Sequence, residues 1–265
     1  DPGLRPVAAA LKSATYTTFT LNIKHDLGKA RALADMKKAF TLGDAGGFQE
    51  MSDLEDRQSL IQLAKQRDYG WFMPTEGGAA IPIVWNRARF RLIDGRTIKT
   101  HDAEEGVTPA RYINVVRLRE ESTGKVFGFI NTHTIAQASY DAQASDMHLI
   151  PRLRKHLRML RNEIRRLSGS TEHVFISGDL NVNYLADRRR RVEGLPTDAL
   201  GGVVSFDMPL QGSRGPTSLL DYGMSLKDGS GLVLDQSRIV HDFNSDHDAV
   251  QLTYRPIDLF ESGPL

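Results

Sequence analysis

The stretch Phe175–Asn181 constrains the fold of this chain more than any other part of its sequence. An apolar strand runs into Gly178 and then places Asp179 and Asn181 two positions apart. Side chains at positions i and i+2 of extended backbone point to the same side, so this spacing directs a carboxylate and an amide at one spot beyond a strand end. Because Asp and Asn are also common in turns, the pair alone is equally compatible with a simple turn.

Polar residues lie at the ends of several other predicted strands. The further clusters are Asn22, Gln49-Glu50, Asn131-Thr-His133 and Ser245-Asp-His247. A turn explains any one of them, but turns are a poor explanation for five such clusters in one chain. We therefore expect these side chains to meet in a single site at the strand ends.

The apolar pattern predicts strands and helices that follow one another along the chain. The clearest helix spans about 147–168, where Leu and Ile recur every three or four positions and form one apolar stripe. Two further helices are expected over about 27–42 and 54–67, each preceded by a capping residue. The expected strands are 16–23, 47–50, 69–73, 80–86, 90–98, 111–119, 126–132, 173–177, 219–224, 231–240 and 250–254, and residues 201–216 are expected to form an irregular loop.

Helices between strands, together with strands that arrive in antiparallel pairs, predict one mixed α/β domain with two sheets. We place this domain at 15–265, after a loosely held lead-in, 1–14, that contains two prolines. No apolar run approaches the roughly 20 residues that span a bilayer, so we expect a soluble monomer without a transmembrane segment. The chain begins with Asp1 rather than Met, which is compatible with a removed leader or a trimmed start, and both the cytoplasm and secretion stay open.

The composition excludes some chemistry and leaves other chemistry open. The chain contains no cysteine, which rules out disulfides, thiolate catalysis and cysteine-ligated zinc. Its net charge is only +1, but Arg152–Arg166 holds seven Arg or Lys against one acid, and Arg188–Arg191 is four arginines in a row. These segments are interpreted either as a solvated helix face with a basic loop or as a contact for nucleic-acid phosphates.

The polar residues at the strand ends supply what phosphate-ester cleavage requires. That reaction needs an activated water, a cation that neutralises charge, and donors to the phosphoryl oxygens. Hard carboxylates suit magnesium, manganese or calcium better than zinc, and Glu50 is the best single ligand candidate. The full set is Asn22, Glu50, Arg111, His133, Asp179, Asn181, Asp221, Asp246 and His247.

These motifs resemble the endonuclease/exonuclease/phosphatase superfamily, the metal-dependent phosphoesterases that include pancreatic-type deoxyribonuclease, abasic-site endonucleases, neutral sphingomyelinases and inositol-polyphosphate 5-phosphatases. Six stretches match in the family order and together cover about 16–254. They are Thr20-Leu-Asn22, Gly47-Phe-Gln-Glu50, Asn131-Thr-His133, Gly178-Asp-Leu-Asn181, Leu220-Asp-Tyr222 and Ser245-Asp-His247. The resemblance implies a four-layer α/β sandwich with two mixed β-sheets packed face to face and helices on the outside.

The resemblance also implies a cofactor and its ligands. Glu50 would bind Mg²⁺, with Asn22 and Asp246 close to it, and Mn²⁺ or Ca²⁺ are the expected substitutes. Asn22 would also contact substrate, as would Arg111 in Pro109-Ala-Arg-Tyr112.

Five residues receive catalytic roles from the resemblance. His247 would be the general base or position the phosphate, and Asp221 would orient its ring. Asp179 would bind or deprotonate the attacking water, or protonate the leaving group. Asn181 would donate to the phosphoryl oxygens, and His133 matches a second histidine of the deoxyribonuclease and sphingomyelinase branches. The remaining histidines, His25, His101, His148, His156, His173 and His241, have no supporting pattern and are assigned to the surface or the core.

The substrate follows less directly from the sequence. Leu21-Asn-Ile-Lys24 departs from the Trp-Asn motif of the abasic-site branch, and the lack of cysteine departs from the disulfide-stapled secreted deoxyribonucleases. The basic helix and the Arg188–Arg191 loop favour a nuclease acting on DNA or RNA, with Arg188 and Arg189 binding substrate. The alternatives are a phosphodiesterase or phosphatase acting on a lipid headgroup, an inositol phosphate or a small nucleotide, and a non-catalytic scaffold, which the intact polar set argues against.

Overall fold

Two six-stranded mixed sheets form the centre of the computed structural model, which describes residues 15–139, 143–229 and 231–257. The first sheet has the order β11 (Leu232–Val240), β12 (Ala249–Pro256), β1 (Tyr16–Asn22), β2 (Ala45–Gln49), β4 (Ile83–Asn86) and β3 (Tyr69–Phe72). The second has the order β5 (Phe90–His101), β6 (Arg111–Glu120), β7 (Val126–His133), β8 (His173–Asp179), β10 (Asp221–Leu226) and β9 (Val204–Phe206). Within each sheet one central pair, β1–β2 or β7–β8, is parallel, and the other pairs are antiparallel.

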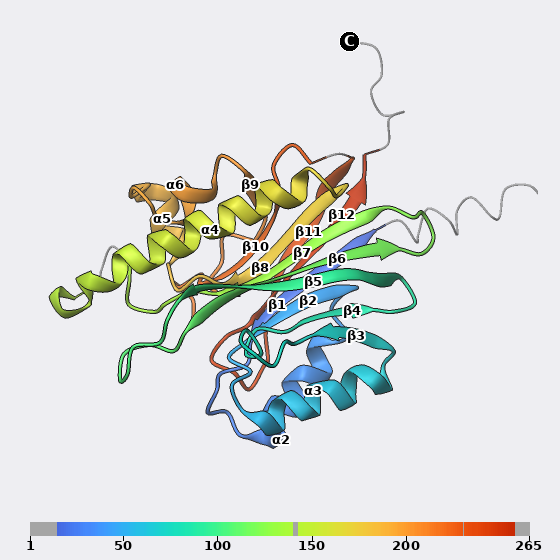
Figure 1. Cartoon of the computed structure of the whole chain (residues 1–265), viewed down its shortest axis with the longest axis horizontal. Helices are drawn as coiled ribbons and strands as arrows, with labels where there is room; N and C mark the ends of the chain where they lie inside the picture. The colour runs from blue at the N-terminus through green and yellow to red at the C-terminus, as the bar shows by residue number, and fades with distance from the viewer. Residues whose placement is uncertain (1–14, 140–142, 230, 258–265) are drawn as a thin grey trace, which may run out of the picture.

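Helices cover the outer face of each sheet, so the molecule has four layers (Figure 1). Helices α2 (Lys29–Ala39) and α3 (Leu54–Gln66) lie on the first sheet. On the other side lie α4 (Ile150–Ser168), α5 (Tyr184–Arg190) and α6 (Pro196–Leu200), and a short 3₁₀ helix, η1 (Ala144–Leu149), leads into α4. The four-layer α/β sandwich expected from the sequence is confirmed. Among the described residues no helix is both long and apolar enough to cross a membrane.

The apolar stripe predicted in the long helix holds α4 against the second sheet. Leu153, Leu157, Leu160, Ile164 and Leu167 are all fully buried. Fully burying one leucine stabilises a fold by about 1.5–3 kcal/mol, so this stripe accounts for most of the attachment of the helix. The basic side chains of α4 lie outside the stripe, and several are ion-paired: Arg152 with Glu104, and Arg166 with Glu163.

Two local predictions were wrong. Arg188–Arg190 belong to helix α5 and not to a loop, and residues 201–216 contain strand β9, which pairs with β10. Helix α5 forms because the Asn183 side chain accepts a hydrogen bond from the backbone N–H of Leu185 at its start, and arginine is a good helix former. The helix ends where Arg191 adopts a left-handed conformation with φ 47°. The lead-in predicted at 1–14 lies outside the described residues.

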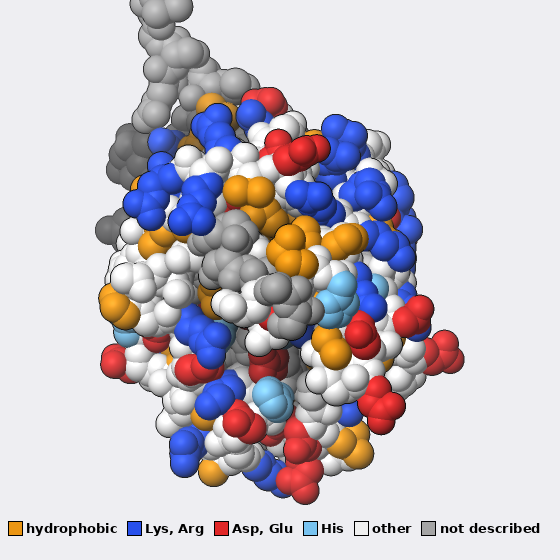
Figure 2. Space-filling model, turned by 90° about the vertical axis from the view of Figure 1, so that its left-hand side faces the viewer, with side chains coloured by type: hydrophobic (Ala, Val, Ile, Leu, Met, Phe, Trp, Pro, Cys, Tyr) orange, Lys and Arg blue, Asp and Glu red, His pale blue; other side chains and the backbone are white. Residues whose placement is uncertain are grey.

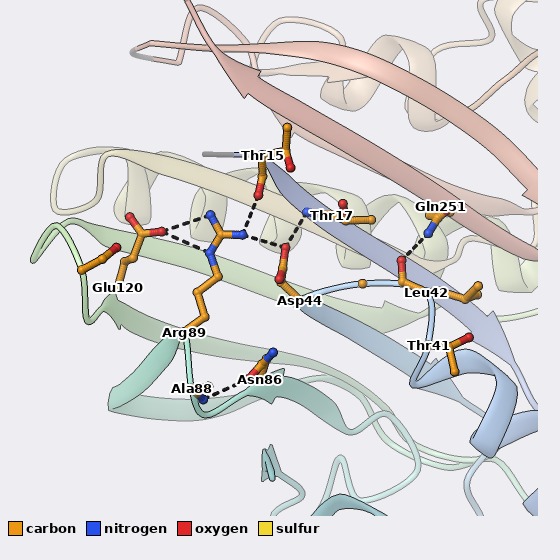
Figure 3. A pocket seen from close by; sticks show the side chains of 12 residues that line it. Thr15, Thr17, Thr41, Leu42, Asp44, Asn86, Ala88, Arg89, Glu120 and Gln251 are labelled. Carbon is orange, nitrogen blue, oxygen red and sulfur yellow. Dashed lines mark hydrogen bonds and ion pairs between the residues drawn. The ribbon is translucent and has the colours of Figure 1, made fainter. Parts of the chain in front are cut away.

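A cluster of charged residues joins the two sheets at the end where β1 begins (Figure 3). The Arg89 guanidinium donates to Glu120 at the end of β6, to Asp44 beside β2 and to the backbone of Thr15. Its charge lies 4.1 Å from the centre of the Tyr16 ring, whose hydroxyl also donates to Glu120. A pocket of about 680 Å³ lies beside this cluster. Because β1 rises about 3.3 Å per residue, the cluster lies about 20 Å from Asn22 at the other end of the strand.

Candidate active site

The predicted site residues meet at one end of the sandwich. Asn22 is the last residue of β1 and Glu50 follows β2, both in the first sheet. From the second sheet, His133 ends β7, Asp179 ends β8, and Asp221 begins the antiparallel β10. His133 and Asp221 are the register neighbours of Asp179 on either side. Figure 2 views this end of the molecule, where acidic side chains lie recessed near the centre and Lys and Arg side chains gather above them.

Asn22 links the two sheets through its amide group. It is fully buried, and its Nδ2 donates to Glu50 Oε1 and to Asp179 Oδ2, both at 3.0 Å. Its Oδ1 accepts from the backbone N–H of Lys24 at 2.9 Å. The amide therefore holds one carboxylate from each sheet in place, and its own role as a metal ligand or substrate contact stays a prediction.

Glu50 is held as a carboxylate by several donors. Its Oε2 accepts from the backbone N–H of His25 at 3.0 Å and contacts His25 Nδ1 at 2.9 Å. Burial opposes ionisation, but the hydrogen bonds from Asn22 and His25 outweigh it and lower the pKa of Glu50 to about 2. The carboxylate is thus charged at neutral pH and available to a cation.

His133 carries its ring proton on the nitrogen that faces the carboxylates. Arg111 Nη1 lies 3.0 Å from His133 Nδ1, and because a guanidinium can only donate, Nδ1 accepts. The proton of the neutral ring is therefore on Nε2, which lies 3.9 Å from Glu50 Oε1 and 3.7 Å from Asp179 Oδ2. Burial, reinforced by the Arg111 charge, holds the pKa of His133 well below its usual range. In this state Nε2 is a donor and not a metal ligand.

His247 is hydrogen-bonded to Asp221. Its Nδ1 lies 2.7 Å from Asp221 Oδ2, which also accepts from the Ser213 hydroxyl at 2.7 Å. Burial opposes protonation of His247, but Asp221 outweighs it and raises the pKa of the ring to about 9. Its Nε2 lies 3.9 Å from Asp179 Oδ2. Burial and the Asp221 charge raise the pKa of Asp179 to about 6. At neutral pH the site therefore holds an imidazolium beside a carboxylate that can accept a proton.

Asn181 does not follow the alternation of the strand, because β8 ends at Asp179. It has φ 52°, its backbone N–H donates to Asp179 Oδ1 at 2.7 Å, and its amide donates to the carbonyl of Thr134 at 3.1 Å. Asp179 and Asn181 thus form a turn at the end of β8, and this turn lies in the candidate site. Glycine is required at position 178 because a Cβ there would overlap the carbonyl of Thr132 on the neighbouring strand.

The remaining predicted residues lie around the rim. Asp246 accepts from Arg214 at 2.8 Å and 3.1 Å and is outside the carboxylate group, so its metal role stays a prediction. Arg188 and Arg189 line a separate pocket of about 600 Å³ together with Leu185, Pro216 and Thr217. Two contributors, His25 and Ser213, were missed because neither stands at a strand end in the sequence pattern.

The group Glu50, His133 and Asp179 offers ligand atoms that lie within 4.8 Å of one another. Since His133 presents an N–H here, two carboxylates from opposite sheets remain. Glu50, with its lowered pKa, is the stronger ligand candidate, and Asp179, with its raised pKa, lies beside it. Mg²⁺ usually binds one or two protein carboxylates and completes its shell with water and phosphate oxygens. The residues present therefore fit a hard divalent cation.

Solved structures with the same fold are known, although no similar sequence was found. No family model matches the chain, and no curated protein matches its sequence. An endonuclease/exonuclease/phosphatase family protein from Bacteroides thetaiotaomicron has a similar structure, with TM-score 0.68 and 13% identity over 91% of this chain and 97% of that one. The mannosyl-6-phosphatase Bt3783 of the same species gives TM-score 0.67 and 13% identity, covering 90% and 99%. D. rerio TDP2 complexed with a single-strand DNA product gives 0.60 and 15%, covering 91% and 99%.

The chain has the fold of the endonuclease/exonuclease/phosphatase superfamily. The predicted four-layer architecture with two mixed sheets agrees with this fold.

Proposed function

We propose that this protein is a metal-dependent phosphoesterase that hydrolyses its substrate by attack of water. The observation that carries the proposal is the pair of carboxylates, Glu50 and Asp179, brought from opposite sheets and bridged by the Asn22 amide. Around this pair stand donors suited to phosphoryl oxygens: His133 Nε2–H, Arg111 and the protonated His247. The similar structures include phosphatases and a DNA-processing protein, which supports the same class of reaction.

In this proposal Glu50 holds the cation, with Asn22 and Asp246 as further candidate ligands. Mg²⁺, or Mn²⁺ or Ca²⁺ in its place, supplies charge neutralisation at the phosphoryl oxygens when bound. Asp179 accepts a proton from the attacking water, because its raised pKa places it close to the working pH. His247 acts as an imidazolium that positions the phosphate, held in that form by Asp221. Asn181 and Arg111 donate to oxygens on which negative charge accumulates.

We propose a nucleic-acid strand as the substrate. The pocket of Arg188 and Arg189 supports this, since it pairs two exposed cations with the apolar surfaces of Leu185 and Pro216. It lies close to the reacting centre: Asn183, two residues after Asn181, donates to the carbonyl of Thr217 in the pocket wall at 2.8 Å. Two residues span at most about 7 Å, so a neighbouring phosphate of a bound strand could reach both arginines. The single-strand DNA held by TDP2 is consistent with such a substrate.

A small phosphoester is the second candidate. The ion pairs of α4 favour it, because Glu104 and Glu163 neutralise part of the basic helix and leave α5 as the main basic element near the site. The similar mannosyl-6-phosphatase acts on a sugar phosphate by its name.

A substrate panel separates the two candidates. Purified protein with Mg²⁺ or Mn²⁺ is offered plasmid, single-stranded DNA, RNA, sphingomyelin, inositol phosphates and mannose 6-phosphate, each with and without chelator. The proposal predicts chelator-sensitive cleavage of at least one nucleic acid. Cleavage of a small ester alone would assign the second candidate, and no cleavage of any member would contradict the phosphoesterase proposal.

A further inference from the structure

The loop after β1 brings an exposed histidine onto the proposed cation-binding carboxylate. Lys24 has φ 61°, an unfavourable region for a residue with a Cβ, and this turn is held by the Asn22 side chain through the Lys24 N–H. Leu27 closes the loop by donating to the carbonyl of Lys24 at 3.1 Å. Because the chain reverses at Lys24, the next residue, His25, faces Glu50.

Glu50 is itself held in a left-handed conformation, with φ 62°. Backbone in such regions persists only where the surroundings fix it, and it gathers at functional sites. The left-handed residues Lys24 and Glu50 lie on separate segments of the chain, and each adjoins the contact between His25 and Glu50.

Hydrogen bonds from His25 and Asn22 together fix both oxygens of the Glu50 carboxylate. His25 binds Oε2 twice, through its backbone N–H at 3.0 Å and through Nδ1 at 2.9 Å. Asn22 Nδ2 binds Oε1 at 3.0 Å. A carboxylate offers about four lone-pair positions, two on each oxygen. His25 takes both positions on Oε2 and Asn22 takes one on Oε1, so one position on Oε1 remains for a cation. The His25 side chain is 66% exposed, against 24% for Glu50, so packing contributes little to its placement.

We propose that His25 is a positioning residue that orients the Glu50 carboxylate for a divalent cation. The inference rests on the proposed function, since it takes Glu50 as the residue that holds the metal. Hydrogen bonds to a metal-binding carboxylate from residues outside the ligand set fix its direction, and their loss commonly weakens metal affinity by about 10–100-fold. The backbone N–H of residue 25 survives every substitution except proline, so a change to any other side chain tests the ring contact alone.

The test measures Mn²⁺ binding directly, from the electron paramagnetic resonance signal of free Mn²⁺. We expect His25→Ala to bind Mn²⁺ about 10–100-fold more weakly than wild type. His25→Asn, whose amide nitrogen stands close to the position of Nδ1, should recover much of the affinity. His148→Ala is the matched control, because His148 is also exposed and also lies beside a glutamate, 3.6 Å from Glu104.

Three measurements separate the outcomes. Thermal unfolding in EDTA should be the same for wild type and both His25 variants, since the role concerns metal and not the fold. If wild type binds Mn²⁺ and hydrolyses phosphoesters but His25→Ala binds Mn²⁺ as tightly, the role of His25 is overturned while the proposed function stands. Equal weakening in His148→Ala would also overturn it. If wild type binds no Mn²⁺, the proposed metal-dependent function is overturned, and the role of His25 is overturned with it.

Discussion

Asp221 and His247 are 26 positions apart in the chain, and their side chains are joined by a 2.7 Å hydrogen bond from Nδ1 to Oδ2. Both side chains are buried, so the carboxylate acts on the ring with little screening from water. The consequence is a histidine that keeps its proton well above neutral pH. This favours the phosphate-positioning role for His247 over the general-base role, and it leaves Asp179 as the proton acceptor.

The pH dependence of catalysis follows from these two groups. In the proposed mechanism, activity requires Asp179 without its proton and His247 with its proton. We expect kcat/KM to rise as pH increases through about 6 and to fall as pH increases through about 9. Initial rates on bis-p-nitrophenyl phosphate across this range check the profile, and a rate still rising beyond the upper limb would contradict the imidazolium role.

Replacing Asp221 with Asn tests the origin of the alkaline limb. The variant keeps the size of the side chain but removes the charge that holds the His247 proton. The pKa of His247 should fall, so the alkaline limb should move to lower pH. The acidic limb should also move to lower pH, because the Asp221 charge raises the pKa of Asp179. Ser213→Ala is the comparison variant, because it removes only a neutral donor to the same oxygen. An alkaline limb that stays in place in Asp221→Asn would show that another group sets it.

His156 should make the fold sensitive to acid. Its ring is fully buried between the hydroxyls of Thr100 and Thr132, at 2.9 Å and 2.7 Å, and burial lowers its pKa from 6.5 to about 3. Because the folded value is the lower one, the unfolded chain binds the extra proton between these values. The contribution of His156 is therefore present above pH 6.5 and is lost as pH falls toward 3, by up to about 1.4 kcal/mol per pH unit.

Urea unfolding of wild type and His156→Gln measures this effect. Wild type should be the more stable protein at about pH 7, and the difference in free energy of unfolding should shrink at about pH 5. A difference that is constant with pH would show that His156 does not titrate as described.

The arginines of α5 should contribute to binding of a nucleic acid through phosphates. In Arg188→Ser/Arg189→Ser, the slope of log affinity against log salt should fall by about 0.9 for each lost contact to duplex DNA, or about 0.7 for a single strand. Hydrolysis of bis-p-nitrophenyl phosphate should not change, because this small ester does not reach the pocket. Arg158→Ser/Arg165→Ser, on the exposed face of α4, controls for net charge. Unchanged binding and cleavage of nucleic acid in the α5 variant would favour the small phosphoester.

The sequence predicted those parts of the site that depend on local pattern. Asp179 and His247 were predicted because each lies beside a strand with a clear apolar pattern. Asp221 lies within the strand predicted at 219–224, and its role beside His247 came from the family resemblance. The apolar stripe of α4 was also predicted from a local pattern.

What could not be predicted depends on contacts between distant segments or on single backbone angles. Strand β9 exists through its pairing with β10, and the run of β-branched and aromatic residues at 203–206 is too short to predict a strand without that partner. The charge of Arg188–Arg190 suggested a loop, but these residues form the end of helix α5, because arginine has a high helix propensity and Asn183 caps the start of the helix. The contact of His25 with Glu50 requires a left-handed Lys24, which the residue type does not favour.

The most direct test of the account is the metal dependence of hydrolysis in wild type and in Glu50→Gln, which keeps the shape of the side chain and removes its charge. Hydrolysis of bis-p-nitrophenyl phosphate is measured with Mg²⁺ or Mn²⁺, in excess EDTA and after metal is restored, with circular dichroism as the check on folding. We expect wild type to lose activity in EDTA and to recover it with metal. We also expect Glu50→Gln to stay folded but to be slower by at least about a hundredfold, since a bound metal supplies several kcal/mol of charge stabilisation in the transition state. Normal turnover by Glu50→Gln, or undiminished wild-type activity in excess EDTA, would contradict this account.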